Sequence, residues 1–266
     1  MHFAQVAPRV DRLSPQGAVE WAAGLTAHNT LLRGGEVGTT DTVASADIDI
    51  NRIITWSSLE WKSPCPDSQN RPWLVVWVVP IKDASARKKA HPIPISRSHQ
   101  GTFGDKPLCT YDALVRAWWL RRVGAEHTIP LDPIGVPGDE WWRTPPMPAA
   151  PPLDSPFFTL QGGEIYRSAD VRELVRKWAT LIDLPPLEFT SRAFRVAGAT
   201  DIRERMGDEE KSKRLIKDRG RWESDIGAIY SRPLVAPQLA ASASVSNATG
   251  AGFEDIFEGF AQPARG

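Results

Sequence analysis

One apolar run constrains the fold most, because its composition suits a buried strand. The segment Trp73–Val79 is rich in valine and contains no polar residue, as is typical of a strand covered by other elements. The segment Ile48–Trp56 alternates apolar and polar residues and predicts a second strand. His91–Ile95 predicts a third, and its two prolines confine it to a sheet edge because proline lacks the N–H that pairing needs. We therefore expect a small three-stranded antiparallel sheet.

Three other segments show the apolar spacing of helices. The first begins after Ser14, which suits an N-cap, and is expected to end at Gly34 and Gly35. The segments Thr110–Val123 and Ser168–Leu181 repeat the helical spacing of apolar residues. The predicted fold class is therefore α+β, a mostly helical domain with a small three-stranded antiparallel sheet.

Composition predicts one domain and a tail. Residues 127–156 contain nine prolines and no sustained period, which predicts a long loop inserted between two parts of the domain. Beyond the predicted domain, residues 1–235, the sequence turns to alanine, serine, asparagine and glycine, so residues 236–266 are expected to be flexible. Within the tail, residues 253–260 place apolar side chains on one helical stripe. We expect this stripe to dock on the domain or on a neighbouring copy, and the alternative is a chance pattern in a disordered tail.

The overall charge gives no sign of a nucleic-acid binder, since 32 Lys and Arg balance 32 Asp and Glu. The distribution is uneven, because residues 82–122 contain nine Lys or Arg against three Asp or Glu. Cys65 and Cys109 are too few for a metal cluster or a disulfide framework. The sequence shows neither the apolar core of a signal peptide nor an apolar run of about 18 residues. We therefore expect no metal, no cofactor and no membrane partner.

The densest chemical pattern lies in residues 191–232. Arg195 is followed at once by the small residues Val196–Thr200, and Tyr230 stands eight positions after Trp222. Chemistry on a phosphodiester needs fixed guanidinium groups, a nearby indole or imidazole donor and a hydroxyl nucleophile. The pattern therefore predicts a site that acts on a phosphodiester. The structural alternatives are a core tyrosine, a packed tryptophan and a solvated basic helix over residues 211–219.

A further arginine stands far upstream. Arg33 follows two leucines and precedes Glu36 by three positions. A cation also suits the last turn of a helix because of the helix dipole, so Arg33 taken alone permits a purely structural interpretation. Its place before Arg195 and Tyr230 favours the functional one.

In this order and spacing, the residues resemble the catalytic domain of tyrosine recombinases, the phage-integrase-type DNA strand-exchange enzymes. The resemblance covers roughly residues 14–235. It implies DNA strand cleavage and rejoining, in site-specific recombination or integration by a mobile element, through a 3′-phosphotyrosine intermediate without metal or ATP. The partners it implies are double-stranded DNA and further copies of the chain, wherever the DNA lies inside the cell.

The resemblance also carries the family's site residues onto this chain, motif by motif. They are Tyr230 as the nucleophile, Arg33 and Arg195 as the phosphate-binding arginines, and Lys82 as the general acid on the hairpin between the second and third strands. Lys88 and Lys89 are alternatives for that lysine, and a solvated basic turn is the structural alternative. The family places a histidine or tryptophan nine residues before the tyrosine. Arg221 holds that position and Trp222 follows it, so Trp222 is the expected indole donor and Arg221 the alternative.

Two departures from the family bear on activity. Arg192 stands where the family has a histidine that exchanges a proton, and arginine cannot act as a base near neutral pH. Only 32 residues precede Arg33, so the family's helical DNA-clamping domain is not expected in this sequence. These departures favour an alternative function, a catalytically inactive DNA-binding descendant of a mobile-element recombinase.

Overall fold

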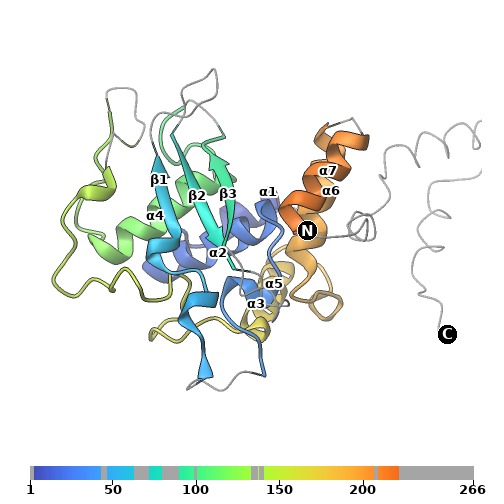
Figure 1. The fold of residues 1–266 in the computed structure, drawn as a ribbon, viewed down its shortest axis with the longest axis horizontal. Helices are drawn as coiled ribbons and strands as arrows, with labels where there is room; N and C mark the ends of the chain where they lie inside the picture. The colour runs from blue at the N-terminus through green and yellow to red at the C-terminus, as the bar shows by residue number, and fades with distance from the viewer. Residues whose placement is uncertain are drawn as a thin grey trace, which may run out of the picture.

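The computed structural model describes residues 3–42, 47–62, 72–79, 90–98, 101–132, 137, 141–206 and 209–221. The described helices are α1 (Phe3–Val6), α2 (Pro15–Asn29), α3 (Gly34–Val37), α4 (Thr110–Arg122), α5 (Ser168–Leu181), α6 (Ala193–Met206) and α7 (Glu209–Gly220). The described strands are β1 (Leu59–Lys62), β2 (Trp73–Val78) and β3 (His91–Ser96). The predicted fold class, mostly helical with a small antiparallel sheet, is confirmed (Figure 1). None of the described helices combines the length and the apolar character that a membrane crossing requires.

The sheet has the order β1-β2-β3, with both pairs antiparallel. The central strand buries Leu74, Val76 and Val78 almost completely, as its run of apolar residues predicts. In β3 both prolines are exposed at the edge, where their missing N–H groups interrupt no further pairing. The sequence therefore predicted the second and third strands.

The prediction of a first strand over Ile48–Trp56 is wrong. That segment contains a 3₁₀ turn at Ile50–Arg52, and the strand forms later, at Leu59–Lys62. The four residues from Ile53 to Trp56 are all buried, so the segment lacks the alternating exposure of a strand. Thr55 and Ser58 exchange hydrogen bonds that cap a second 3₁₀ turn, and β1 begins after that turn.

Helix α2 is the centre of the fold. It packs against α4 on one side and against α5 and α6 on the other, so helices from the middle and the C-terminal part of the described chain meet on it (Figure 1). Close approach to α6 depends on Gly198, where an added Cβ would lie 2.0 Å from the carbonyl oxygen of His28. A side chain at position 198 would therefore push α6 away from α2.

The proline-rich loop takes part in the core, although the sequence predicted an insertion. Trp141 in this loop is 2% exposed, and its ring lies 4.7 Å from that of Trp61, measured between centroids. The same two rings pack edge-on against Trp118 of α4. Aromatic pairs of this geometry add to the stabilisation that burial provides. The described part of the loop therefore closes one end of the core.

Candidate functional site

The turn after α2 positions Arg33. Helix α2 ends at Asn29, and Gly34 and Gly35 begin α3, so the predicted helix end at these glycines is wrong. The helix stops because Leu31 has a φ of 53°, in the left-handed region that a helix cannot continue through. A left-handed conformation costs an L-residue about 1–2 kcal/mol. Leu31 is completely buried, so its packing offsets this cost.

Arg33 is fixed at both its backbone and its side chain. It precedes α3, and its backbone N–H donates to Oε2 of Glu36 over 2.7 Å. Its Nη1 donates to Oε1 of the same carboxylate, also over 2.7 Å. The Arg33 side chain is 30% exposed, whereas that of Glu36 is completely buried. Arg33 therefore has a partly exposed guanidinium group whose orientation is fixed by the buried carboxylate of Glu36.

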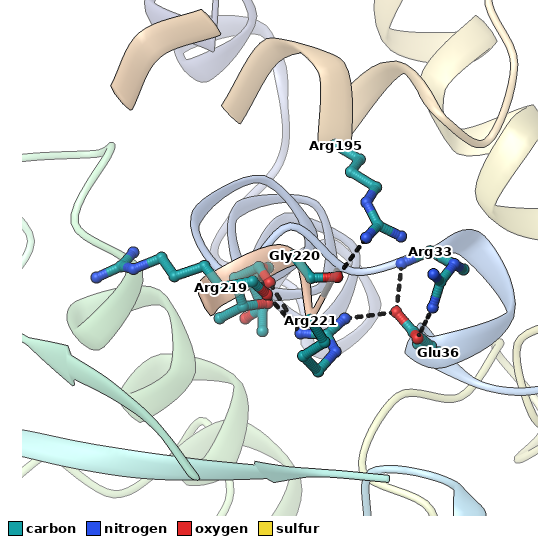
Figure 2. Close-up of polar contacts among 8 residues, drawn as sticks. Arg33, Glu36, Arg195, Arg219, Gly220 and Arg221 are labelled. Atoms are coloured by element: carbon teal, nitrogen blue, oxygen red, sulfur yellow. Dashed lines mark hydrogen bonds and ion pairs between the residues drawn. The ribbon is translucent and has the colours of Figure 1, made fainter. Parts of the chain in front are cut away.

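One further arginine, Arg221, contacts the same carboxylate, and another, Arg195, acts on it through its charge. Nη2 of Arg221 lies 2.6 Å from Oε2 of Glu36. Figure 2 shows these side chains approaching from three different segments, and we call Arg33, Glu36, Arg195 and Arg221 the arginine cluster. The four groups carry three positive charges and one negative charge. A guanidinium group is planar and can bind a phosphate through two hydrogen bonds. The cluster is therefore suited to an anion such as phosphate.

Glu36 remains ionised despite its burial. Burial by itself raises the pKa of this carboxyl. Arg221 and Arg33, together with the backbone N–H of Arg33 and the charge of Arg195, outweigh that effect and hold the pKa of Glu36 below its usual range. The carboxylate is thus charged at neutral pH, and it can order the guanidinium groups around it.

Arg195 is buried within the first turn of α6. It is 2% exposed, and its Nη2 donates to the carbonyl oxygen of Gly220 over 2.5 Å. That bond joins α6 to the C-terminal end of α7 (Figure 2). The close approach of α6 to α2 at Gly198, one turn further on, brings Arg195 to the level of the Arg33 turn. The small residues after Arg195 therefore have a packing role that the position of the cluster depends on.

The end of α7 caps the end of α2. Nη1 of Arg219 donates to the carbonyl oxygen of Asn29 over 2.6 Å, and Nη1 of Arg221 donates to that of Thr30 over 3.2 Å. The last carbonyl groups of a helix have no partner within the helix and carry partial negative charge. Cations supplied by α7 satisfy these groups, and this fixes where the turn leading to Arg33 begins.

The structure thus brings together three of the predicted site residues, Arg33, Arg195 and Arg221. Arg192 is exposed at the start of α6, and its backbone N–H donates to Oγ1 of Thr190 over 3.3 Å. In the described residues no hydrogen bond or ion pair joins the Arg192 side chain to Glu36. The remaining predicted site residues lie outside the described residues: Lys82, its alternatives Lys88 and Lys89, Trp222 and Tyr230.

Sequence reasoning missed the central role of Glu36, although its position three residues after Arg33 was the available signal. It also missed Arg219, which is one cation in a basic run and has no distinctive spacing. Among the described residues, no group of three or more His, Cys, Asp or Glu is arranged to hold a metal ion.

No protein-family model, curated protein or solved structure matches the chain. The interpretation of the site therefore depends on its own residues and their geometry.

Proposed function

We propose that this protein cleaves and rejoins DNA strands through a covalent intermediate on Tyr230, in the manner of the tyrosine recombinases that its motifs resemble. The observation that carries the proposal is the arginine cluster, in which Arg33 and Arg221 bind one buried carboxylate and Arg195 adds a third positive charge nearby. The proposed substrate is double-stranded DNA, and further copies of the chain are the proposed partners on it.

The proposed reaction exchanges one phosphoester bond for another. The Tyr230 hydroxyl oxygen attacks the backbone phosphorus and gives its proton to solvent water, and the bond to the 5′-oxygen breaks. Lys82 supplies a proton to that leaving oxygen, which departs as a 5′-hydroxyl group. The 5′-hydroxyl of another strand then attacks the 3′-phosphotyrosine and returns a proton to Lys82. A new DNA linkage forms, and the tyrosine oxygen leaves and takes a proton from solvent water. Bond energy is kept in the covalent intermediate throughout.

The cluster suits the charge that develops in this reaction. The five-coordinate phosphate carries extra negative charge on its equatorial oxygens, and preorganised donors stabilise it without having to reorient. Arg33 is the member of the cluster with an accessible guanidinium group, at 30% side-chain exposure. Arg195 and Arg221 are nearly buried and support the positive potential from within the fold. Arg205 and Arg219 line a separate cavity of about 500 Å³ together with Asp201 and apolar side chains, and flanking phosphates are proposed to contact these two arginines.

One observation favours the second candidate function, a DNA-binding protein without cleavage activity. Arg192 holds the position where the family has a proton-exchanging histidine, and its side chain is exposed. Such a residue can contact a DNA phosphate but cannot accept a proton from the tyrosine. The two functions share DNA binding and differ only in the covalent step.

A trapped covalent adduct distinguishes them. The substrates are duplexes of random sequence that carry a nick close to the cleavage site. Cleavage then releases a short fragment, and rejoining is prevented because the 5′-hydroxyl group leaves with that fragment. The wild-type protein is expected to form an adduct that survives denaturing electrophoresis, and Tyr230→Phe is expected to form none. Arg9→Gln is the control, since Arg9 is half exposed and pairs with Asp183 away from the cluster. Salt-sensitive DNA binding without any adduct would favour the second function, and absence of binding would refute both.

A further inference from the structure

We infer that Arg221 is a positioning residue that orients the Arg33 guanidinium group through Glu36, and that it does not itself bind the phosphate. The reaction that it serves rests on the proposed function, whereas the contacts that support the inference are independent of it. The inference differs from the role that sequence position suggests, which is a substitute for the indole donor. The geometry around Arg221 distinguishes the two roles.

The donors of Arg221 are directed into the protein. Its Nη1 donates to the carbonyl oxygens of Thr30 and Arg219, over 3.2 and 2.7 Å, and its Nη2 donates to Glu36 over 2.6 Å. The side chain is only 3% exposed. A guanidinium group has five N–H donors, and in Arg221 three of them make these bonds, while Nε is buried without a hydrogen-bond partner. The burial of the side chain, rather than a full set of partners, keeps solvent and ligands away from it. A phosphate therefore has no open approach to this side chain in the described structure.

Glu36 connects Arg221 to Arg33. Its Oε2 accepts from both Nη2 of Arg221 and the backbone N–H of Arg33, and its Oε1 accepts from Nη1 of Arg33. The carboxylate is thus held from one side by Arg221 and holds Arg33 on the other. Burial opposes the charge on Glu36, and Arg221 is the first of the cations that stabilise it. Loss of Arg221 would therefore weaken both the charge and the orientation of the group that fixes Arg33.

The backbone of Arg221 supports the same role. Its φ is 55°, a left-handed conformation that is unfavourable for a residue other than glycine. Glycine would adopt this conformation without strain, but the glycine of this turn stands one position earlier, at Gly220. An arginine in the strained position is consistent with a need for its side chain there. In the sequence, Arg221 lies nine residues before Tyr230. The same residue therefore fixes the Arg33 turn and the starting point of the segment that leads to the proposed nucleophile.

A double-mutant cycle tests the inference. Single-turnover cleavage of the nicked duplex is measured for wild type, Arg33→Gln, Arg221→Gln and the double variant. We expect Arg221→Gln to slow cleavage by about 10-fold in the wild type but by less than about 2-fold in the Arg33→Gln background. Losses that multiply in the double variant would mean that Arg221 contacts the phosphate itself, which would overturn the inference. If Arg221→Gln does not fold, Arg221→Lys replaces it in the cycle with the same criterion.

A second measurement does not require cleavage. The side-chain carboxyl carbon of Glu36 is titrated by NMR, and Arg221→Gln is expected to raise the pKa of Glu36. Arg219→Gln is the matched control, because Arg219 caps the neighbouring carbonyl of α2 but is not among the groups that act on Glu36. The inference is wrong if the two variants shift Glu36 equally or not at all. If the wild type forms no covalent adduct but the titration behaves as expected, the proposed function fails and the positioning role remains.

Discussion

The Arg97–Asp112 pair and the arginine cluster are both buried, but their charges balance differently. Arg97 lies just beyond β3 and is completely buried, and Asp112 of α4 is 5% exposed. Nε and Nη2 of the arginine contact the two carboxylate oxygens over 2.7 and 3.2 Å, and the backbone N–H of Gly104 donates to Oδ2 of Asp112 over 3.0 Å. The guanidinium group therefore binds the carboxylate through two hydrogen bonds. This pair joins the sheet to α4.

In the arginine cluster, Arg33 and Arg221 both form ion pairs with Glu36. The charge of Arg195 acts on the same carboxylate. Burial of like charges is unfavourable unless something compensates for them. Both oxygens of Asp112 bind Arg97, whereas the single carboxylate of Glu36 is shared by Arg33 and Arg221. We propose that Arg97–Asp112 serves stability and that the cluster serves binding, and the predictions below test that division.

The largest effect on stability is expected at the Arg97–Asp112 pair. Arg97→Met leaves Asp112 buried without its cation, and breaking a buried pair in this way costs about 3–5 kcal/mol. Urea unfolding of the variant would measure the loss. Arg33→Met is the matched control and should cost much less, because Arg33 is partly exposed and Glu36 keeps Arg221. Equal losses at the two positions would contradict the division between stability and binding.

The largest effect on activity is expected at the cluster. Arg33→Ala should lower the single-turnover cleavage rate by about 10²–10³-fold, the range observed when one preorganised donor to a developing anion is removed. The thermal midpoint should change little, and this separates the loss from unfolding. Arg9→Ala provides the comparison for an arginine outside the cluster. A rate close to that of the wild type would remove Arg33 from the site.

A smaller effect concerns acid stability. The folded-state pKa of Glu36 lies below its usual value of 4.5, so its stabilising contribution is fully present above that value and is lost as the pH falls through the folded value. The difference in unfolding free energy between wild type and Glu36→Gln should therefore narrow as the pH falls below about 4.5. Taking the difference between the unfolding free energies of the two proteins cancels the contributions of other carboxyl groups with lowered pKa values, such as Asp11 and Asp201. A difference that stays constant with pH would show that Glu36 is not ionised in the fold.

The smallest effect is expected at Arg192, which is exposed three residues before Arg195 in the sequence. Arg192→His should change stability by no more than about 0.5 kcal/mol, as is usual for a surface substitution. Cleavage should be kept or increased, because histidine restores a group that can exchange a proton near neutral pH. A sharp loss of single-turnover cleavage would instead show that Arg192 binds phosphate, and the binding region would then extend beyond the cluster.

The sequence predicted elements whose own residues determine them. The run of β-branched and aromatic residues in β2 and the apolar spacing of α4 and α5 each specify a local structure, and the structure has these elements. The end of α2 was predicted wrongly because it depends on Leu31, whose left-handed turn is held by packing against Ala199 and Ile216. Those residues lie more than a hundred positions away, and local propensity carries no information about them.

The site shows the same limit. The order of Arg33 and Arg195 along the chain was visible in the sequence, and so was the spacing from Arg33 to Glu36. Neither observation could show that Arg221 would turn inward onto Glu36, because that contact depends on a left-handed residue after α7 and on the carbonyl at the end of α2. Charge in a sequence identifies candidates, and only packing decides which of them face solvent.

The bond between Arg221 and Glu36 joins residues that are 185 positions apart, and this affects how the protein matures during synthesis. Ribosomes add roughly 5–20 residues per second, so Glu36 emerges roughly 10 to 40 s before Arg221. A nascent chain that stalls before Arg219 lacks both guanidinium groups that cap α2. The order of synthesis therefore delays the Arg221–Glu36 bond, and the cluster forms only after nearly all of the described fold has left the ribosome.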